Sequence, residues 1–284
     1  MNLTYILLAL TVLICLFTKN RNLMLLSLLI TTISAFSQGI VNLVGIITLL
    51  FFHMICNIYF SYEALNKYWK WVLFVAIVVL LAGYIFHMIP GFSNALVIDK
   101  VHVSPTSSLF SMYLNFDKTI SALILYVAAK LFIVEKLVDK KSLQQTLYTL
   151  LLCVAVILIP GLLSGYIKFD PKVPDILQLW IFNNLLFVVV TEEIIFRGFL
   201  QNKLKSFLGE KAASNYIHII IASTIFGLAH FKGGIIYILL ALIAGGFYGY
   251  AYEKTNRISC SVIVHFGLNL VHLMLFTYPA AVIA

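Results

Sequence analysis

The stretch VVVTEEIIFRGFL, residues 188–200, places two glutamates and an arginine inside an otherwise apolar run. A charged side chain near the middle of a membrane helix costs about 2.5–3.5 kcal/mol on insertion scales, so these groups need partners. Glu193 and Arg197 are four residues apart, and on a helix their side chains meet on one face. Glu192 points elsewhere and has no such partner within the stretch. The pattern therefore predicts one paired glutamate beside one that is available for other contacts.

A plainer interpretation of the same residues stays open at this point. The glutamates could end an apolar span at the membrane interface, with Arg197 extending its side chain toward the lipid headgroups. The rest of the chain has to decide between these interpretations.

Composition places the chain in a membrane. It has 284 residues, of which 62% are hydrophobic and 11% charged, whereas soluble domains carry about 25% charged residues. The apolar runs are continuous rather than alternating, and only helices and closed barrels satisfy their backbone in lipid. We therefore expect an all-α, polytopic transmembrane helical bundle.

Ten apolar segments are candidate spans. The first two are short for a crossing that needs about 20 residues, so we expect about eight to ten spans. The segments are approximately 3–17, 23–36, 40–60, 71–90, 118–134, 146–166, 176–199, 212–231, 234–252 and 258–276.

The net charge of +8 is concentrated in alternate loops, which is the pattern of cytoplasmic loops in membrane proteins. No nucleic-acid-binding module accompanies it, so we expect the lipid bilayer as partner and no nucleic acid. This pattern favours a multi-pass protein of the cell membrane, inner or plasma. The four cysteines all lie in apolar segments without C-x-x-C spacing, which indicates helix packing rather than a disulfide or thiolate site.

Two further apolar segments carry polar side chains at helical spacing. In IASTIFGLAHF, Phe226 and His230 are four residues apart, and in SCSVIVHFGLNLVHLMLF the same spacing joins His265 and Asn269. His272 lies two turns beyond His265. Buried polar groups in a bundle need partners, so these residues are expected to converge on a polar site.

The ordered set E-E-x-x-x-R, F-x-x-x-H and H-x-x-x-N resembles the CAAX-protease and bacteriocin-processing family of intramembrane peptidases. The resemblance covers roughly a third of the chain and implies a C-terminal four-helix catalytic block. We therefore expect a peptidase core at 176–276. The region 1–175 carries none of these motifs, and its role is unassigned.

The resemblance also implies roles for the motif residues. Glu192, with His230, would polarise a water molecule that attacks the scissile carbonyl carbon. His265 and Asn269 would donate hydrogen bonds to the developing oxyanion. Amide hydrolysis needs both a base for water and donors aimed at the new negative charge.

The supporting residues of the motifs are expected to hold this arrangement in place. Glu193 and Arg197 would fix the helix that presents the catalytic glutamate, and Phe226 would serve in packing.

A metal remains an alternative. Two histidines and a carboxylate can bind zinc with an open position, and His230, His265 and Glu192 would be its ligands. The H-E-x-x-H pattern is absent, and the same groups can activate water without metal. Relatives have been described in both ways; we favour a site without a cofactor.

Depth in the membrane is the difficult point. If 176–199 and 212–231 both cross straight, Glu192 lies near the end of one span and His230 near the opposite end of the next. Either the segment 200–215 dips into the membrane or one helix is bent.

Two function classes follow. The first is an intramembrane endopeptidase that cleaves a membrane-associated or secreted peptide or protein. The second is a non-catalytic membrane protein, an immunity or scaffold factor or a transporter, whose polar cluster binds a ligand or proton. The polar residues are confined to one block, and no matching broken helices occur in two halves, which favours the enzyme.

Overall fold

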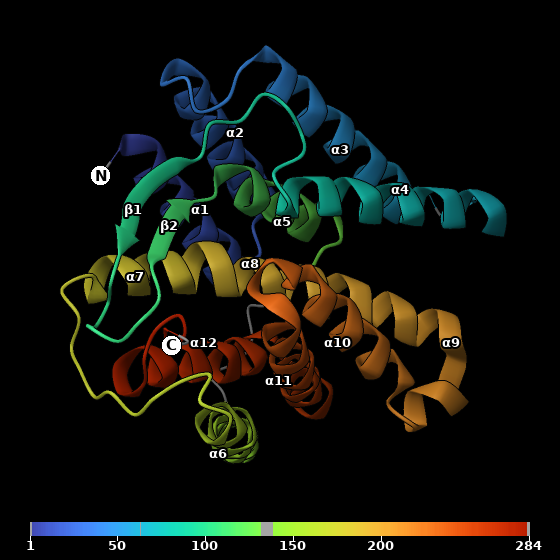
Figure 1. Ribbon diagram of the computed structural model, residues 1–284. Coiled ribbons are helices and arrows are strands. Elements are labelled where there is room, and N and C mark those ends of the chain that lie inside the picture. The colour runs from blue at the N-terminus through green and yellow to red at the C-terminus, as the bar shows by residue number, and fades with distance from the viewer. Residues whose placement is uncertain (1, 63, 132–138, 283–284) are drawn as a thin grey trace. The chain divides into compact units, whose positions relative to one another are not determined.

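The computed structural model describes residues 2–62, 64–131 and 139–282. Within this part of the chain the structure is helical apart from one two-stranded sheet, as Figure 1 shows. The predicted all-α polytopic bundle is confirmed. Contacts divide the chain into two compact units that alternate along the sequence: one comprises 1–97, 113–134 and 186–191, and the other 98–112, 135–185 and 192–284.

Six described helical segments are long and apolar enough to cross a membrane. They are Leu43–Ser61, Lys67–Ile85, Lys140–Leu163, Leu177–Gly209, Phe231–Thr255 and Ile258–Leu275. Three further apolar helices are shorter, at Leu3–Phe17, Arg21–Ser37 and Ile217–Ala229.

Two of the predicted spans differ from the structure in length. The segment predicted at 118–134 forms α5, Phe116–Ala128, and residues 132–138 at its end lie outside the described residues. The segment predicted at 212–231 forms α10, Ile217–Ala229, which has 13 residues and is too short for a full crossing. In α10 the left-handed backbone of Tyr216 precedes the first turn, and the bend at His230 follows the last.

The first unit is built from five helices. In this unit α5 contacts each of the other four helices, and α1 also pairs with α2 and α3 with α4. Its elements are α1 (Leu3–Phe17), α2 (Arg21–Ser37), α3 (Leu43–Ser61), α4 (Lys67–Ile85) and α5.

A hairpin occupies part of the long polar connection at 91–117. Its strands are β1 (Ala95–Val101) and β2 (Phe110–Leu114). Beside it, Asp117 is 1% exposed and accepts hydrogen bonds from His87 Nδ1 at 2.7 Å and Asn94 Nδ2 at 2.9 Å. These contacts fasten the loop before β1 to the first turn of α5, a structural use of His87.

The second unit contains every residue of the predicted motifs. Helix α11 contacts α6, α10 and α12, and α10 lies beside α11 along its length (Figure 1). The elements from residue 140 onward, of which residues 186–191 belong to the first unit, are α6 (Lys140–Leu163), α7 (Leu177–Asn183), η1 (Asn184–Val189), α8 (Val190–Glu193), η2 (Ile194–Gln201), α9 (Asn202–Ser214), α10, η3 (Phe231–Gly233), α11 (Gly234–Thr255) and α12 (Ile258–Leu275).

Glycines allow α10 and α11 to approach closely. A Cβ atom on Gly227 of α10 would lie 2.7 Å from Leu242 Cβ of α11, and one on Gly245 would lie 3.0 Å from a ring carbon of Phe226. Small residues at helix crossings permit this in membranes, and α11 carries them in the segment AGGFYG at 244–249.

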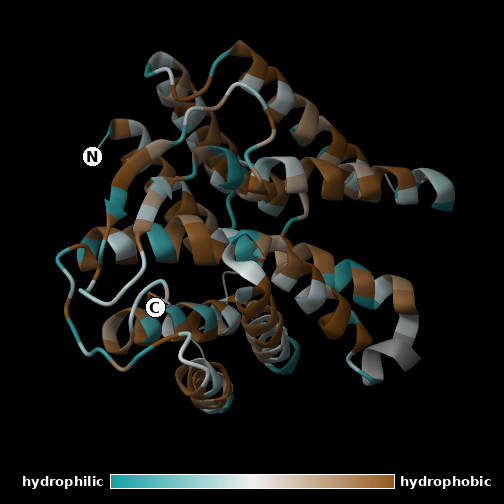
Figure 2. Cartoon of the chain, in the orientation of Figure 1, coloured by the Kyte–Doolittle hydropathy of each residue, from teal (hydrophilic) through white to brown (hydrophobic). Residues whose placement is uncertain are grey.

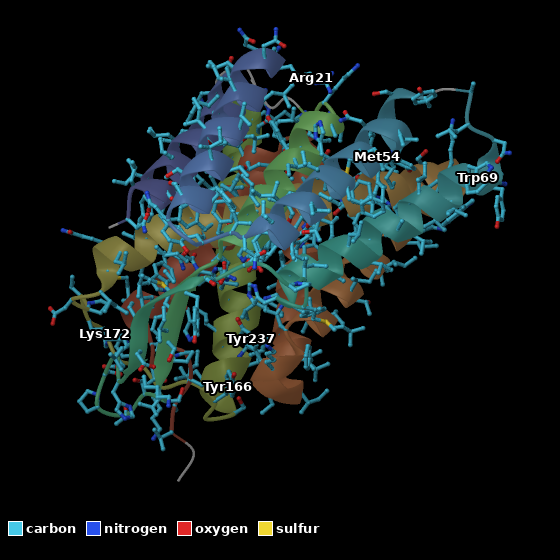
Figure 3. All side chains as sticks on the ribbon, turned by 90° about the horizontal axis from the view of Figure 1, so that it is seen from above. Arg21, Met54, Trp69, Tyr166, Lys172 and Tyr237 are labelled. Carbon is cyan, nitrogen blue, oxygen red and sulfur yellow. The ribbon has the colours of Figure 1, made fainter. Side chains whose placement is uncertain are left out.

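The outer faces of the helices are apolar. Figure 2 shows long hydrophobic stretches on α3, α4 and α6, and exposed side chains such as Met54 (49%) and Trp69 (53%) project from α3 and α4 in Figure 3. Exposed apolar surface of this extent suits a lipid environment. The chain is a multi-pass membrane protein. All four cysteines are buried and free, as expected for packing residues.

Candidate active site

The two glutamates lie near the middle of a long helical segment rather than at its end. Residues Leu177–Gly209 form one 33-residue segment, whereas the sequence suggested a span that stops at 199. The segment continues because Leu204, Phe207 and Leu208 extend the apolar pattern. The glutamates are thus central in this segment, whereas the predicted span placed them near its end. The four-residue helix α8 carries both glutamates, and Figure 2 shows a hydrophilic patch there.

The backbone around α8 is unusual. The π-helical stretches η1 and η2 flank it on both sides. π-Helical turns are rare and occur frequently at functional sites. The wider turn changes the direction in which successive side chains point, so the pair of glutamates is presented at a local irregularity of the helix.

Glu193 is the centre of the polar cluster. Its carboxylate accepts a hydrogen bond from Arg197 Nε at 3.1 Å, another from the Ser261 hydroxyl, and lies 2.8 Å from His265 Nδ1. The side chains of Glu193 and Arg197 are 0% exposed. A buried ion pair is tolerated when further hydrogen bonds satisfy its polar atoms, and here Ser261 and His265 do so for the carboxylate of Glu193.

Glu192 lies next to this centre with a small exposed fraction. Its side chain is 12% exposed, and its Oε2 atom is 4.0 Å from His265 Nε2. The imidazole of His265 therefore stands between two carboxylates, with Glu193 at one nitrogen and Glu192 facing the other.

Aromatic rings enclose the charged groups. The Tyr248 ring stacks on the His265 ring at 4.2 Å with an interplanar angle of 13°. The Arg197 guanidinium lies 5.2 Å from the Phe226 ring centre and 5.8 Å from that of Tyr248. Cation–π contacts of this kind stabilise a desolvated cation. Phe226, expected to act in packing, is 2% exposed and lies against both Arg197 and His265.

His230 follows the last turn of α10 rather than lying within it. Its Nδ1 atom is 2.8 Å from the backbone carbonyl of Phe226, and its ring is 4.6 Å from the Phe226 ring. Because a carbonyl only accepts, Nδ1 carries the proton, and in the neutral ring Nε2 keeps its lone pair. The Tyr237 ring packs edge-on against His230 at 5.5 Å, and the Tyr237 hydroxyl lies within electrostatic range of Glu192.

Asn269 lies one turn beyond His265 on α12. Its side-chain amide donates to Asn184 Oδ1 at 3.3 Å. His272 is turned elsewhere, with Nε2 3.2 Å from the backbone carbonyl of Thr277, so it does not join the cluster. The structure thus brings Glu192, Glu193 and His265 into one cluster and places Asn269 beside it.

The donor set was tested for a metal. Among the described residues, no three side chains of histidine, cysteine, aspartate or glutamate are grouped closely enough to hold an ion. In addition, Nδ1 of His265 is engaged by Glu193 and Nδ1 of His230 by a backbone carbonyl. The residues His230, His265 and Glu192 do not fit a zinc centre in this arrangement.

Four contributors were missed in the sequence. Ser261 lies four residues before His265, so the repeat of polar residues at 261, 265 and 269 was a usable signal. Tyr248 lies within AGGFYG, a segment in which the small residues indicate helix packing and give no sign of a polar site. Asn184, next to Asn183, and Tyr237 lie in apolar runs, and only the three-dimensional structure shows their contacts.

Comparison with known proteins gives one match. Residues 174–271 match the family model described as type II CAAX prenyl endopeptidase Rce1-like. Comparison with curated proteins and with solved structures gave no match. The matched segment contains all three sequence motifs and begins close to the predicted boundary at 176. Over residues 174–271, about a third of its length, the chain is therefore similar to Rce1-like type II CAAX prenyl endopeptidases.

Proposed function

We propose that the chain is an intramembrane endopeptidase that hydrolyses a peptide bond of a membrane-associated or secreted peptide or protein, in the cell membrane. The observation that carries the proposal is the pair of adjacent glutamates with different partners. Glu193 is held by Arg197, Ser261 and His265, while Glu192 lies beside the cluster with part of its side chain exposed. A fixed carboxylate next to an accessible one suits a site that has to place a reactive group accurately.

In the proposed reaction Glu192 acts as general base. It takes a proton from a water molecule while the water oxygen bonds to the scissile carbonyl carbon. The proton then passes to the leaving nitrogen as the C–N bond breaks, so that one water is consumed and two chain ends are formed. His230 assists by accepting a hydrogen bond from the water at Nε2, the nitrogen that its contact with Phe226 leaves with a lone pair.

His265 and Asn269 are proposed to stabilise the oxyanion. Since Nδ1 of His265 donates to Glu193, Nε2 can donate only if the ring carries both protons. Asn269 is oriented by its bond to Asn184. Donors that are fixed before the reaction are worth more than mobile ones, because they cost no reorganisation.

The test compares wild type with Glu192→Gln in cells that lack the protein, by mass spectrometry of peptide termini in membrane and secreted fractions. Asp175→Asn makes the same chemical change at an exposed aspartate ahead of α7 and serves as the matched control. We expect new termini with wild type and Asp175→Asn, and their absence with Glu192→Gln at matched membrane levels.

The opposite result has a clear meaning. If Glu192→Gln produces the same termini, the proposed base is wrong. If no form produces termini while a cellular phenotype persists in Glu192→Gln, the protein acts without hydrolysis, as an immunity or scaffold factor or a transporter. Repeating the cleavage with purified protein and a chelator tests the metal directly.

A further inference from the structure

A row of polar side chains extends from the Glu193 cluster to the surface of the second unit at Lys205. Glu193, Arg197, Gln201 and Lys205 follow one another at four-residue spacing along α8, η2 and α9. The first three are 0% exposed, and the Lys205 side chain is 44% exposed. The row therefore begins at a fully buried ion pair and ends at the surface.

Several buried polar atoms on this row and on α10 beside it lack hydrogen-bond partners within the protein. In the described part of the chain no protein group hydrogen-bonds to Arg197 Nη1 and Nη2, Gln201 Oε1, Ser223 Oγ or His218 Nδ1. Each of these side chains is at most 2% exposed. Most buried polar atoms in proteins have a hydrogen-bond partner, because leaving one without a partner destabilises the fold. Five orphaned atoms in one region need a common explanation.

The orphaned atoms come from helices that contact one another. Arg197 and Gln201 lie on η2, Ser223 and His218 on α10, and both elements pack against α11. A Cβ atom on Gly249 of α11 would lie 2.7 Å from Gln201 Oε1 and 2.8 Å from Ile219 Cγ2, next in sequence to His218. One turn away, a Cβ atom on Gly245 would lie 3.4 Å from Ser223 Cβ. Gly245 and Gly249 of α11 thus both lie against the polar side chains of η2 and α10.

The surface end of the row is a linked set of titratable groups. His218 Nε2 lies 3.0 Å from Glu253 Oε2, and Lys205 Nζ donates to Glu253 Oε1 at 2.5 Å. His218 is fully buried, while Lys205 reaches solvent. His218 therefore joins the surface pair through one ring nitrogen and presents the other, unpartnered nitrogen to the interior.

We propose that these atoms bind a chain of water molecules, the water file, which connects the surface at Lys205 with the Glu193 cluster. The donor and acceptor types are complementary: the Arg197 nitrogens donate, Gln201 Oε1 accepts, and the Ser223 hydroxyl does both. Buried water typically makes about three hydrogen bonds to otherwise unsatisfied polar groups. A peptidase site inside an apolar bundle needs a supply of water, because it consumes one water molecule per bond cleaved. This role of the water file rests on the proposed function, whereas the binding of water does not.

Radiolytic hydroxyl labelling tests the file on the purified full chain, because bound water activated by X-rays labels the side chains beside it. We expect oxidation of His218 and Phe226 despite their burial. Trp180, which is 1% exposed and whose indole N–H already donates to the Tyr278 hydroxyl, is the internal control and stays unlabelled.

Two matched variants locate the water. Ser223→Ala and Thr224→Val each remove one hydroxyl from α10, but the Thr224 hydroxyl already donates to the Ile220 carbonyl at 2.9 Å. Ser223→Ala and Gln201→Leu should lower labelling of His218 and Phe226 severalfold, and Thr224→Val should leave it unchanged. Equal melting temperatures and helical circular dichroism confirm that the variants are folded.

The outcomes separate the two proposals. Unlabelled His218 and Phe226 in wild type, or labelling unaffected by Gln201→Leu, would overturn the file. Labelling that persists in a protein without cleavage activity would support the file and count against the peptidase. If labelling falls in Ser223→Ala and cleavage falls severalfold with it, the file supplies the reaction.

Discussion

Glu193 and His265 lie 72 residues apart in sequence, yet Glu193 Oε1 is 2.8 Å from His265 Nδ1 between two different helices. The same carboxylate pairs with Arg197 and Ser261. The glutamate that the sequence motif suggested only as an anchor for its own helix is therefore also the group that orients a second motif.

Removing the charge of Glu193 should destabilise the protein strongly. Glu193→Gln leaves the Arg197 cation buried without its carboxylate, and breaking a buried pair costs about 3–5 kcal/mol. A double variant, Glu193→Gln with Arg197→Met, should recover part of this loss. Thermal unfolding in detergent measures both. A double variant less stable than the single one would show that the pair is not coupled as the distances indicate.

The stack of Tyr248 on His265 gives a second prediction. Tyr248→Phe keeps a ring at 4.2 Å and should retain cleavage, whereas Tyr248→Leu loses the stacking, which is worth about 0.5–1.5 kcal/mol beyond burial. We expect Tyr248→Leu to lower the yield of new peptide termini severalfold. Equal loss in both variants would assign the effect to the hydroxyl instead of the ring.

Two glycines of α11 form a matched pair. A Cβ atom on Gly249 would lie 2.7 Å from Gln201 Oε1, whereas one on Gly246 meets nothing within 4 Å. Gly249→Ala should destabilise by about 1–3 kcal/mol through overpacking. Gly246→Ala should be neutral or stabilise by up to about 1 kcal/mol, since alanine favours helix. Melting temperatures of both variants check this, and equal shifts would contradict the close packing.

A pH prediction concerns the start of α6. Asp139 caps this helix, and hydrogen bonds from the Ser142 backbone amide and hydroxyl, both at 2.9 Å, hold the pKa of the carboxyl below its usual value. A lowered folded-state pKa contributes stability above the unfolded value of about 3.9, and this contribution is lost as pH falls through the folded value.

Asp139→Asn provides the control for this effect, because asparagine still caps the helix but does not titrate. Between about pH 5 and pH 3 the melting temperature of wild type should fall further than that of Asp139→Asn. Parallel curves for the two proteins would remove Asp139 from the acid response.

The sequence predicted the main features of the fold because they depend on local composition. Continuous apolar runs require helices in lipid, and four-residue spacing predicted the Glu193–Arg197 pair that the structure contains. Element lengths were less predictable. The helical segment that carries Glu192 continues to Gly209. This was hard to predict because lysines are interspersed among its apolar residues and lower the local hydropathy.

Contacts between helices could not be predicted in the same way. Ser261 and Tyr248 reach the cluster through packing of α11 and α12, and helical spacing alone does not reveal which neighbour a side chain meets. His230 lies past the end of α10 because the backbone bends there, a tertiary effect that periodicity does not contain. The catalytic roles of Glu192, His230, His265 and Asn269 remain predictions.

The alternation of the two units along the chain has a consequence for biogenesis. The first unit comprises residues 1–97, 113–134 and 186–191. Glu192 is the first residue after the last of these three pieces. During synthesis the helices of the first unit emerge long before 186–191 do, so the unit stays incomplete until the segment that carries Glu192 and Glu193 is itself being made. A fragment that ends at residue 175 would lack this piece. Ribosome-bound intermediates of increasing length should therefore gain protease resistance in the N-terminal helices only once residue 191 has left the exit tunnel.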